Sequence, residues 1–111
     1  MKTLIKNIEF SKVINLKNLI SYQEAQVISR TIAQTPAVSI SLFSLDKGEG
    51  ISTHVTPGDA MVQVLDGEAE ITIGNNIFNV KAGETIIMPS NVPHGLEARV
   101  RFQMLLTVIK N

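Results

Sequence analysis

The chain contains no cysteine. A disulfide framework and thiolate chemistry are therefore excluded, and we expect a reducing compartment, with the cytoplasm as the default location. Long apolar runs are also missing, since the longest late run, residues 104–109, is far too short to span a bilayer. Charged residues interrupt residues 1–12, so we expect neither a secretory signal nor a membrane partner.

An excess of charge of one sign is absent as well. Ten basic residues balance ten acidic ones, so the chain has no large field that would attract nucleic acid or an anionic membrane. With 111 residues, the chain is long enough to bury about two-thirds of the surface that its unfolded form exposes. No linker, internal repeat or low-complexity tract divides it, which predicts a single domain over residues 1–111.

Apolar and polar residues alternate through nearly everything after residue 25, which is the pattern of strands with one face buried. Turn residues break the alternation, among them Pro57-Gly58-Asp59, Asp66-Gly67 and Gly74-Asn75-Asn76. Many short strands at regular spacing predict an antiparallel barrel or sandwich and not a parallel sheet. The expected strands cover residues 38–43, 51–56, 60–65, 68–73, 77–80, 85–88, 94–100 and 102–110.

Two stretches, residues 48–67 and 83–94, carry a framework of glycine, proline and histidine. Together they resemble the two sequence motifs of the cupin superfamily, and the resemblance covers roughly residues 38–110. It implies an all-β fold, an antiparallel double-stranded β-helix or jelly-roll barrel, over about residues 26–110. Residues 1–25 would then form an N-terminal arm, in which residues 14–20 fit either a strand or a short helical turn.

Cupins often hold a metal with three histidines and a glutamate, and only two of these ligands are present here. His54 and His94 match two of the family's histidines, whereas Thr56 replaces the third and Ala60 replaces the glutamate. Two histidines alone would hold a divalent transition metal such as Fe, Mn, Ni or Zn weakly. Asp59 could complete a face of two histidines and one carboxylate. An aspartate after Pro-Gly is, however, well explained by hydrogen bonds to nearby backbone.

An intact scaffold with a depleted metal set predicts a stand-alone cupin that binds a small organic molecule in its barrel. The replacements at Thr56 and Ala60 remove charge and enlarge the cavity, which suits an apolar ligand with one or two hydrogen-bonding groups. The barrel interior is expected to contain His54, Val62, Val64, Ile71, Ile73, His94 and Met104. The predicted ligand-binding residues are His54, Thr56, Ala60, Val62, Met88, His94 and Met104.

Two other functions fit the same sequence, and the sequence leaves open whether the chain is an enzyme. One is a metal-dependent dioxygenase, isomerase or decarboxylase that uses His54 and His94 with a third ligand, or His94 as an acid or base without metal. The other is a structural or sensory module whose main property is self-association. Small cupins commonly pair through the outer face of one sheet, and the apolar segment 14–20 would suit such pairing, so we expect a homodimer. The fold alone does not decide among these functions.

Overall fold

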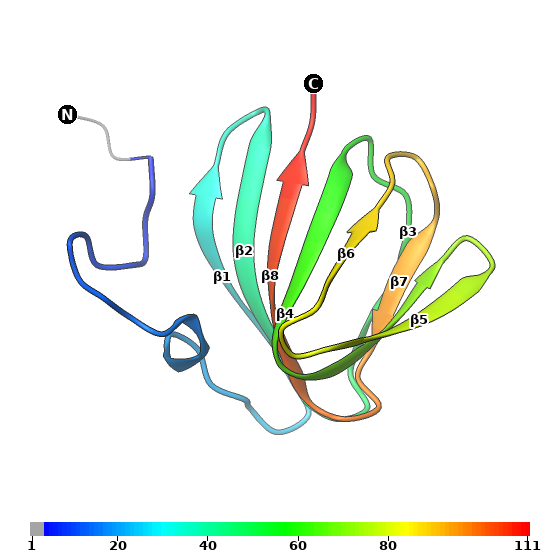
Figure 1. Ribbon diagram of the computed structural model, residues 1–111, viewed down its shortest axis with the longest axis horizontal. Coiled ribbons are helices and arrows are strands. Elements are labelled where there is room, and N and C mark those ends of the chain that lie inside the picture. Colours follow the sequence, from blue (N-terminus) through cyan, green and yellow to red (C-terminus); the bar gives the residue numbers. More distant parts are fainter. Residues whose placement is uncertain (1–3) are drawn as a thin grey trace.

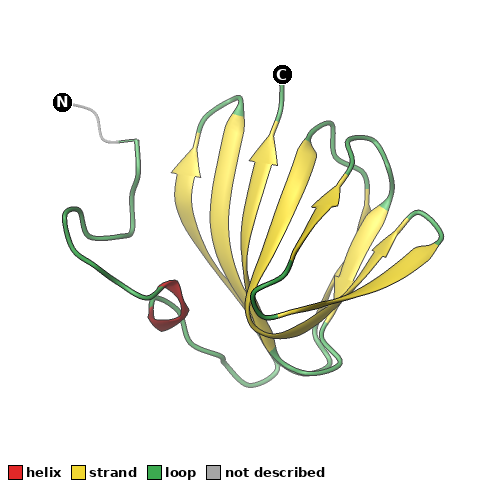
Figure 2. Cartoon of the chain, in the orientation of Figure 1, coloured by secondary structure: helices red, strands yellow, loops and turns green. Residues whose placement is uncertain are grey.

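The computed structural model describes residues 4–111, and strands make up nearly all of its regular structure (Figures 1 and 2). Every strand pairing is antiparallel, as predicted. None of the helices described within these residues is long and apolar enough to cross a membrane. The elements are η1 (Leu16–Asn18), β1 (Val27–Gln34), β2 (Val38–Leu45), β3 (Gly50–His54), β4 (Asp59–Ile73), β5 (Asn76–Lys81), β6 (Thr85–Met88), β7 (His94–Glu97) and β8 (Phe102–Ile109).

The strands form a curled structure because the long strand β4 takes part in two sheets. Its first half pairs with β8 and β6, which with β2 and β1 gives sheet A in the order β1-β2-β8-β4-β6. Its second half pairs with β5 and β7, which with β3 gives sheet B in the order β5-β4-β7-β3. The inner faces of the two sheets enclose the core.

The predicted turn at Asp66-Gly67 is wrong, because β4 runs through it without reversing. The register with β8 shifts between Val64 and Asp66, which is the mark of a β-bulge, and Gly67 has a positive φ of 73°. A side chain at Gly67 would run into the carbonyl oxygen of Arg101. The glycine therefore bends the strand from sheet A into sheet B, where the sequence pattern had suggested a hairpin.

Other strand boundaries also differ from the prediction. The strand expected over residues 51–56 is β3, which ends at His54, so Thr56 lies in the loop that follows. β7 ends at Glu97 and not at residue 100, because Ala98 bonds to the loop before β3: its N–H donates to Glu49 O at 2.9 Å and its carbonyl accepts from Gly48 N at 2.7 Å. The chain then bends into β8. β1 was not among the predicted strands, although it pairs with β2 along most of its length.

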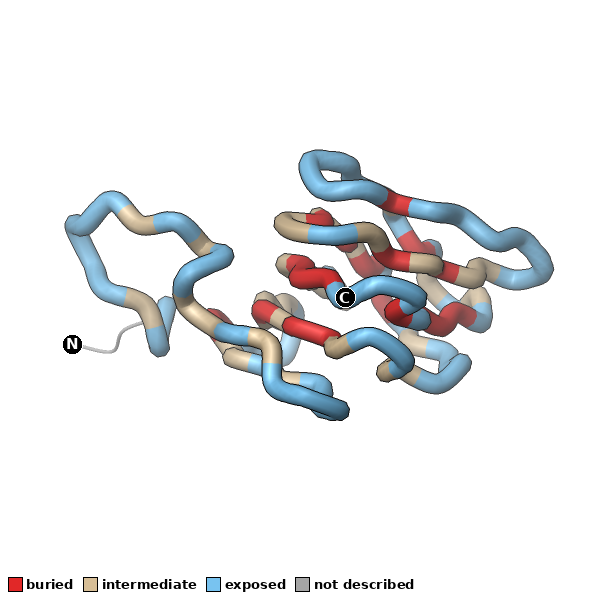
Figure 3. Tube along the Cα trace, turned by 90° about the horizontal axis from the view of Figure 1, so that it is seen from below, coloured by how far each residue is buried: buried red, intermediate tan, exposed pale blue. Residues whose placement is uncertain are grey.

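The core lies on the inner faces of both sheets, where alternate residues are buried (Figure 3). Most of the predicted interior is confirmed there, including Val62, Val64, Ile71 and Met104, while Ile73 is partly buried. His54 is the exception because it is exposed. The buried cluster consists of Leu45, Ala60, Val62, Val64, Ala69, Ile71, Val80, Met88, Leu96, Ala98, Phe102 and Met104.

Residues 4–25, called the arm below, lie beside β1 and apart from the strands of sheet B (Figure 1). Of the two alternatives for residues 14–20, the helical turn is observed, as η1. Near its start the arm bonds to β1, where Lys6 N donates to Ile32 O at 2.8 Å and Asn7 Nδ2 donates to Thr31 O at 2.7 Å. The arm thus covers part of the outside of sheet A.

Candidate functional site

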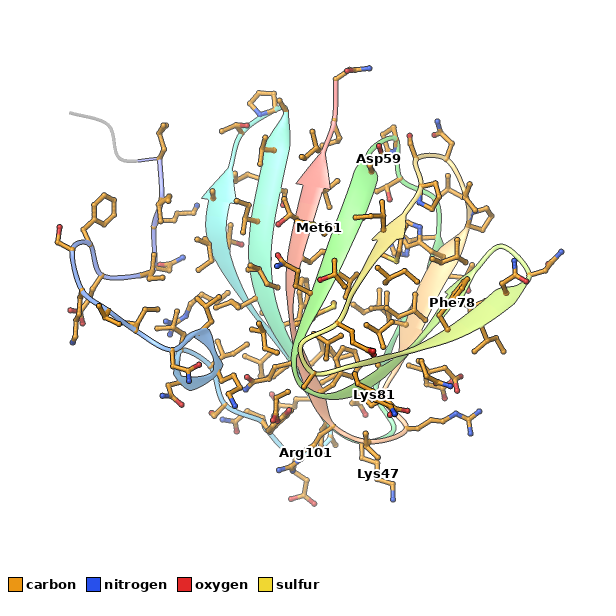
Figure 4. All side chains as sticks on the ribbon, in the orientation of Figure 1. Lys47, Asp59, Met61, Phe78, Lys81 and Arg101 are labelled. Carbon is orange, nitrogen blue, oxygen red and sulfur yellow. The ribbon has the colours of Figure 1, made fainter. Side chains whose placement is uncertain are left out.

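The two histidines meet at one end of the barrel. His54 ends β3 and His94 begins β7, and the two residues are direct cross-strand partners. Their ring centroids are 4.5 Å apart with an edge-to-face angle of 67°. This is the end where Asp59 begins β4, opposite to the end where Lys47 and Arg101 lie (Figure 4). His94 is buried, at 2% exposure, whereas His54 faces solvent.

Backbone carbonyls fix the tautomers of both rings. His54 Nδ1 lies 2.8 Å from Ser52 O, and His94 Nδ1 lies 3.0 Å from Val92 O. A carbonyl oxygen only accepts, so Nδ1 must carry the hydrogen, and Nε2 of each neutral ring keeps its lone pair. Thr56 Oγ1 lies 3.5 Å from His94 Nε2, the outer limit for a hydroxyl that donates to this nitrogen. The result is a pair of basic nitrogens beside a hydroxyl.

This donor set does not fit a tightly bound transition metal. Within residues 4–111 no group of three or more histidine, aspartate or glutamate side chains is placed to hold an ion, and such sites usually need three or four ligands. Asp59 does not complete the set, because its Oδ1 accepts from Ser90 N at 2.9 Å and so ties two loops together. Ala60, at the family's glutamate position, is buried in the core.

The apolar members of the predicted ligand site are packed into the core. Ala60 and Met88 are cross-strand neighbours, and they are as fully buried as Val62 and Met104. A ligand could reach these four side chains only by displacing others. Met61 lies on the outer face of β4, opposite to its buried neighbours Ala60 and Val62.

Four inward-facing apolar residues remain partly exposed beside the histidines, and sequence reasoning had missed all but one of them. Their positions follow from the register, which sets three of them opposite buried Ala60 or Val62 and the fourth opposite His94. The alternation that marks Met104 could have found the pair on β8, at two and four residues further along. Together with His54, Thr56 and His94 they form what we call the mouth; the four are Ile73, Ile86, Leu106 and Val108.

Two cavities lie away from the mouth. One, of about 390 Å³, is an open groove on the outer face of β3, β7 and β4, between Thr53 and Thr72 and above Gly95. The other, of about 470 Å³, lies between the arm and the outer face of sheet A and is bordered by Tyr22 and Gln103. Sequence reasoning indicated neither cavity, because each is assembled from residues far apart in the chain.

Known proteins are similar to this chain in sequence and in fold. The sequence model of a family described as "Cupin domain" matches residues 41–109. A solved structure of a conserved protein of unknown function from Streptococcus pyogenes is 46% identical, with a TM-score of 0.97 over 99% of this chain and 96% of that one.

Two more solved structures are similar over most of the chain. A cupin superfamily protein from Desulfitobacterium hafniense is 31% identical, with a TM-score of 0.93 over 98% of this chain and 100% of that one. A cupin 2 conserved barrel domain protein from Leptotrichia buccalis is 39% identical, with a TM-score of 0.86 over 87% of this chain and 47% of that one. No curated protein sequence matches significantly.

Proposed function

This chain belongs to the cupin family, and we propose that it binds a small organic molecule at the mouth of its barrel. The observation that carries the proposal is the state of the two rings: both Nδ1 atoms are held by backbone carbonyls, which leaves two Nε2 lone pairs at one end of the barrel. Partly exposed apolar side chains lie beside them. Concave, largely apolar sites with a few fixed polar groups are typical of small-molecule binding.

The geometry favours a ligand with an apolar body and a hydroxyl or N–H group. Each neutral Nε2 is an acceptor, so the ligand must supply the donor. The apolar body would contact Leu106 and Val108 on β8 and Ile86 on β6. Exposed His54 would be met first, and buried His94 would fix the inner end of the ligand.

Metal binding at the mouth is proposed to be weak or absent. Thr56 and Ala60 supply neither the imidazole nor the carboxylate of a complete site, so the charge of a divalent cation would be poorly offset. A metal-dependent enzyme would need a third strong ligand beyond His54 and His94, and Asp59 is engaged with Ser90. The enzyme alternative is therefore the weaker of the two.

A thermal-shift screen of a metabolite panel tests the proposal. We expect at least one compound to raise the melting temperature of the wild type but not that of the His54→Ala, His94→Ala double variant. Thr53→Ala is the matched control, because Thr53 precedes His54 and contacts the outer side of Gly95; it should respond like the wild type. If no compound acts through the histidines, the proposal is wrong and a structural role becomes the better one.

Metal analysis of the same proteins separates the enzyme alternative. We expect much less than one equivalent of iron, manganese, nickel, copper or zinc in the purified wild type. About one equivalent that disappears in the double variant would contradict the depleted-site argument and favour a metal-dependent reaction.

We also infer that the chain forms a homodimer through the outer face of sheet A. Where the arm does not cover it, this face presents Ile87 and Ile109, which are 50% and 60% exposed. The arm itself exposes Phe10 and Val13. Apolar surface of this kind, on both a sheet face and an adjacent arm, is typical of an interaction site. A second copy offers matching surfaces to both.

A further inference from the structure

Three polar side chains on the outer face of sheet A hold three consecutive residues of the arm. Ser44, Gln103 and Asp66 are neighbours in register across β2, β8 and β4, and we call them the polar row. Ser44 Oγ donates to Ser21 O at 2.9 Å, and Gln103 Nε2 donates to the carbonyl of the preceding arm residue, Ile20, at 3.2 Å. Tyr22, the next arm residue, completes the set, since its hydroxyl donates to Asp66 Oδ2 at 2.6 Å.

Tyr22 is held from a second side as well. The guanidinium of Arg101 lies 4.5 Å from the centre of the Tyr22 ring and also 3.3 Å from Asp46 Oδ1. Burial, followed by the hydrogen bond to Asp66, raises the pKa of the Tyr22 phenol far above its usual range. Tyr22 is therefore a neutral, fixed donor at neutral pH.

One atom of the polar row has no partner. Gln103 is only 4% exposed, and its Oε1 is buried without a hydrogen-bond partner among residues 4–111. Turning the amide over would set Oε1 against the carbonyl oxygen of Ile20, so the orientation is fixed by the arm. A buried acceptor without a hydrogen-bond partner destabilises the folded state, so this oxygen calls for a donor.

The cavity of about 470 Å³ borders this residue, and its two sides differ in chemistry. On the barrel side lie Gln103 and Asp66, whose free oxygens are acceptors. On the arm side lie Lys17 and Asn18 of η1, whose side chains supply N–H donors and one positive charge. The volume is within the range of about 300–1,000 Å³ that is usual for small-molecule sites.

We propose that this cavity binds a small zwitterion of the free amino-acid class. Its ammonium group would donate to the free oxygen of Asp66, and to Gln103 Oε1 once a small shift of that side chain opens the buried atom to the cavity. Its carboxylate would face Lys17 and Asn18. Such a ligand joins the arm to the barrel, so binding stabilises the docked arm by mass action. This site is separate from the mouth and does not depend on the function proposed there.

Amide NMR of the isotopically labelled protein tests the proposal, with free L-amino acids titrated one at a time. We expect at least one to shift the Gln103 side-chain amide and the backbone amides of residues 17–22. The N-acetylated form of that amino acid lacks the ammonium and should not bind, and its carboxamide should bind more weakly. These blocked ligands test the site without altering the protein.

A pair of carboxylate variants sharpens the test. Asp66→Asn keeps an oxygen acceptor for Tyr22 but removes the charge, and we expect the affinity to fall about tenfold or more. Asp46→Asn is the matched control: Asp46 also holds the arm, through Ala25 N at 2.8 Å, but lies outside the cavity lining. It should leave the affinity within about twofold of the wild type.

Three results would overturn the proposal. The first is the absence of any titration with the free amino acids, and the second is equal binding of the N-acetylated forms. The third is a crystal structure, grown with the amino acids present, in which only a water molecule contacts Gln103 Oε1. The last result would mean that ordinary hydration satisfies the buried acceptor.

Discussion

The inner and outer faces of sheet A differ in how they are covered. On the inner face, Val62, Val64 and Met104 pack into one buried cluster with residues of sheet B, and the apolar residues of the mouth pack against this cluster while staying partly exposed. On the outer face, the arm covers β2 and β8 through the polar row, and Ile87 on β6 stays half exposed. The strands therefore bury the inner face of sheet A by themselves. The outer face is covered by the arm and, we propose, by a second copy of the chain.

The largest loss of stability is expected from a substitution at Gly67, where β4 bends from sheet A into sheet B. Gly67→Ala would force a side chain against Arg101 O and within 3.0 Å of Phe102 Cα, in a backbone conformation with φ of 73°. We expect a loss of about 3 kcal/mol or more in the free energy of unfolding, because neither the bulge nor β8 can move without disturbing both sheets. Chemical denaturation measures this loss.

Gly83→Ala is the matched control for that experiment. Gly83 also has a positive φ, of 90°, but open space surrounds its position. Backbone strain alone predicts a loss of about 1 kcal/mol there. If the two alanine variants lost equal stability, the close approach between β4 and β8 would not be what makes Gly67 necessary.

The inner face could be predicted from the sequence because its signals are local. Alternation identified Val62, Val64 and Met104, and the motif framework identified the His54–His94 pair that the structure brings together. The exposure of His54 could not be predicted, because it depends on β3 ending at this residue, and the sequence pattern extended the strand to residue 56. The same limit applies to Asp66-Gly67, a dipeptide that suits a turn and a bulge equally well.

The outer face carried no comparable signal. The bonds of the polar row join residues 23, 44 and 83 positions apart, so only the folded chain shows that the row exists. Gln103 resembles any polar residue on the solvent side of a strand. Ile87 resembles any apolar residue of a short strand, and only the register with Met61 shows that it faces outward. Tertiary contacts, and not propensity, determine these roles.

The second prediction concerns the uncovered part of the outer face. We expect the wild type to sediment as a dimer at micromolar concentration and Ile87→Lys to sediment as a monomer, because a buried, unpaired ammonium at a symmetric interface costs several kcal/mol. Val100→Lys is the control, since Val100 is equally exposed, at 50%, but lies in the loop before β8. It should remain a dimer. A monomeric wild type would contradict the inference that a second copy covers this face.

The smallest effect is expected from Tyr22, which links the arm to the polar row. Tyr22→Phe removes the hydroxyl that donates to Asp66 and should cost about 1 kcal/mol. Amide exchange in residues 17–25 should become faster. The ring signals of His94 should not change, because the mouth lies on the inner face. If exchange were unchanged in the arm, the hydrogen bond would contribute nothing to its docking.

Because of the same tyrosine, we expect the docking of the arm to weaken at alkaline pH. Because the folded-state pKa of Tyr22 is raised, its contribution to stability is fully present below the ordinary tyrosine pKa of about 10 and is lost as the pH rises above it. The chain has one tyrosine and no tryptophan, so tyrosinate absorbance reports on this residue alone. We expect its titration midpoint to lie well above the ordinary value in the folded protein and to return to that value in denaturant.

The Asp66→Asn variant separates the two causes of this shift. A smaller shift in that variant would assign part of it to the carboxylate. An ordinary midpoint in the folded wild type would show that Tyr22 is free in solvent and that the arm is not held at this position.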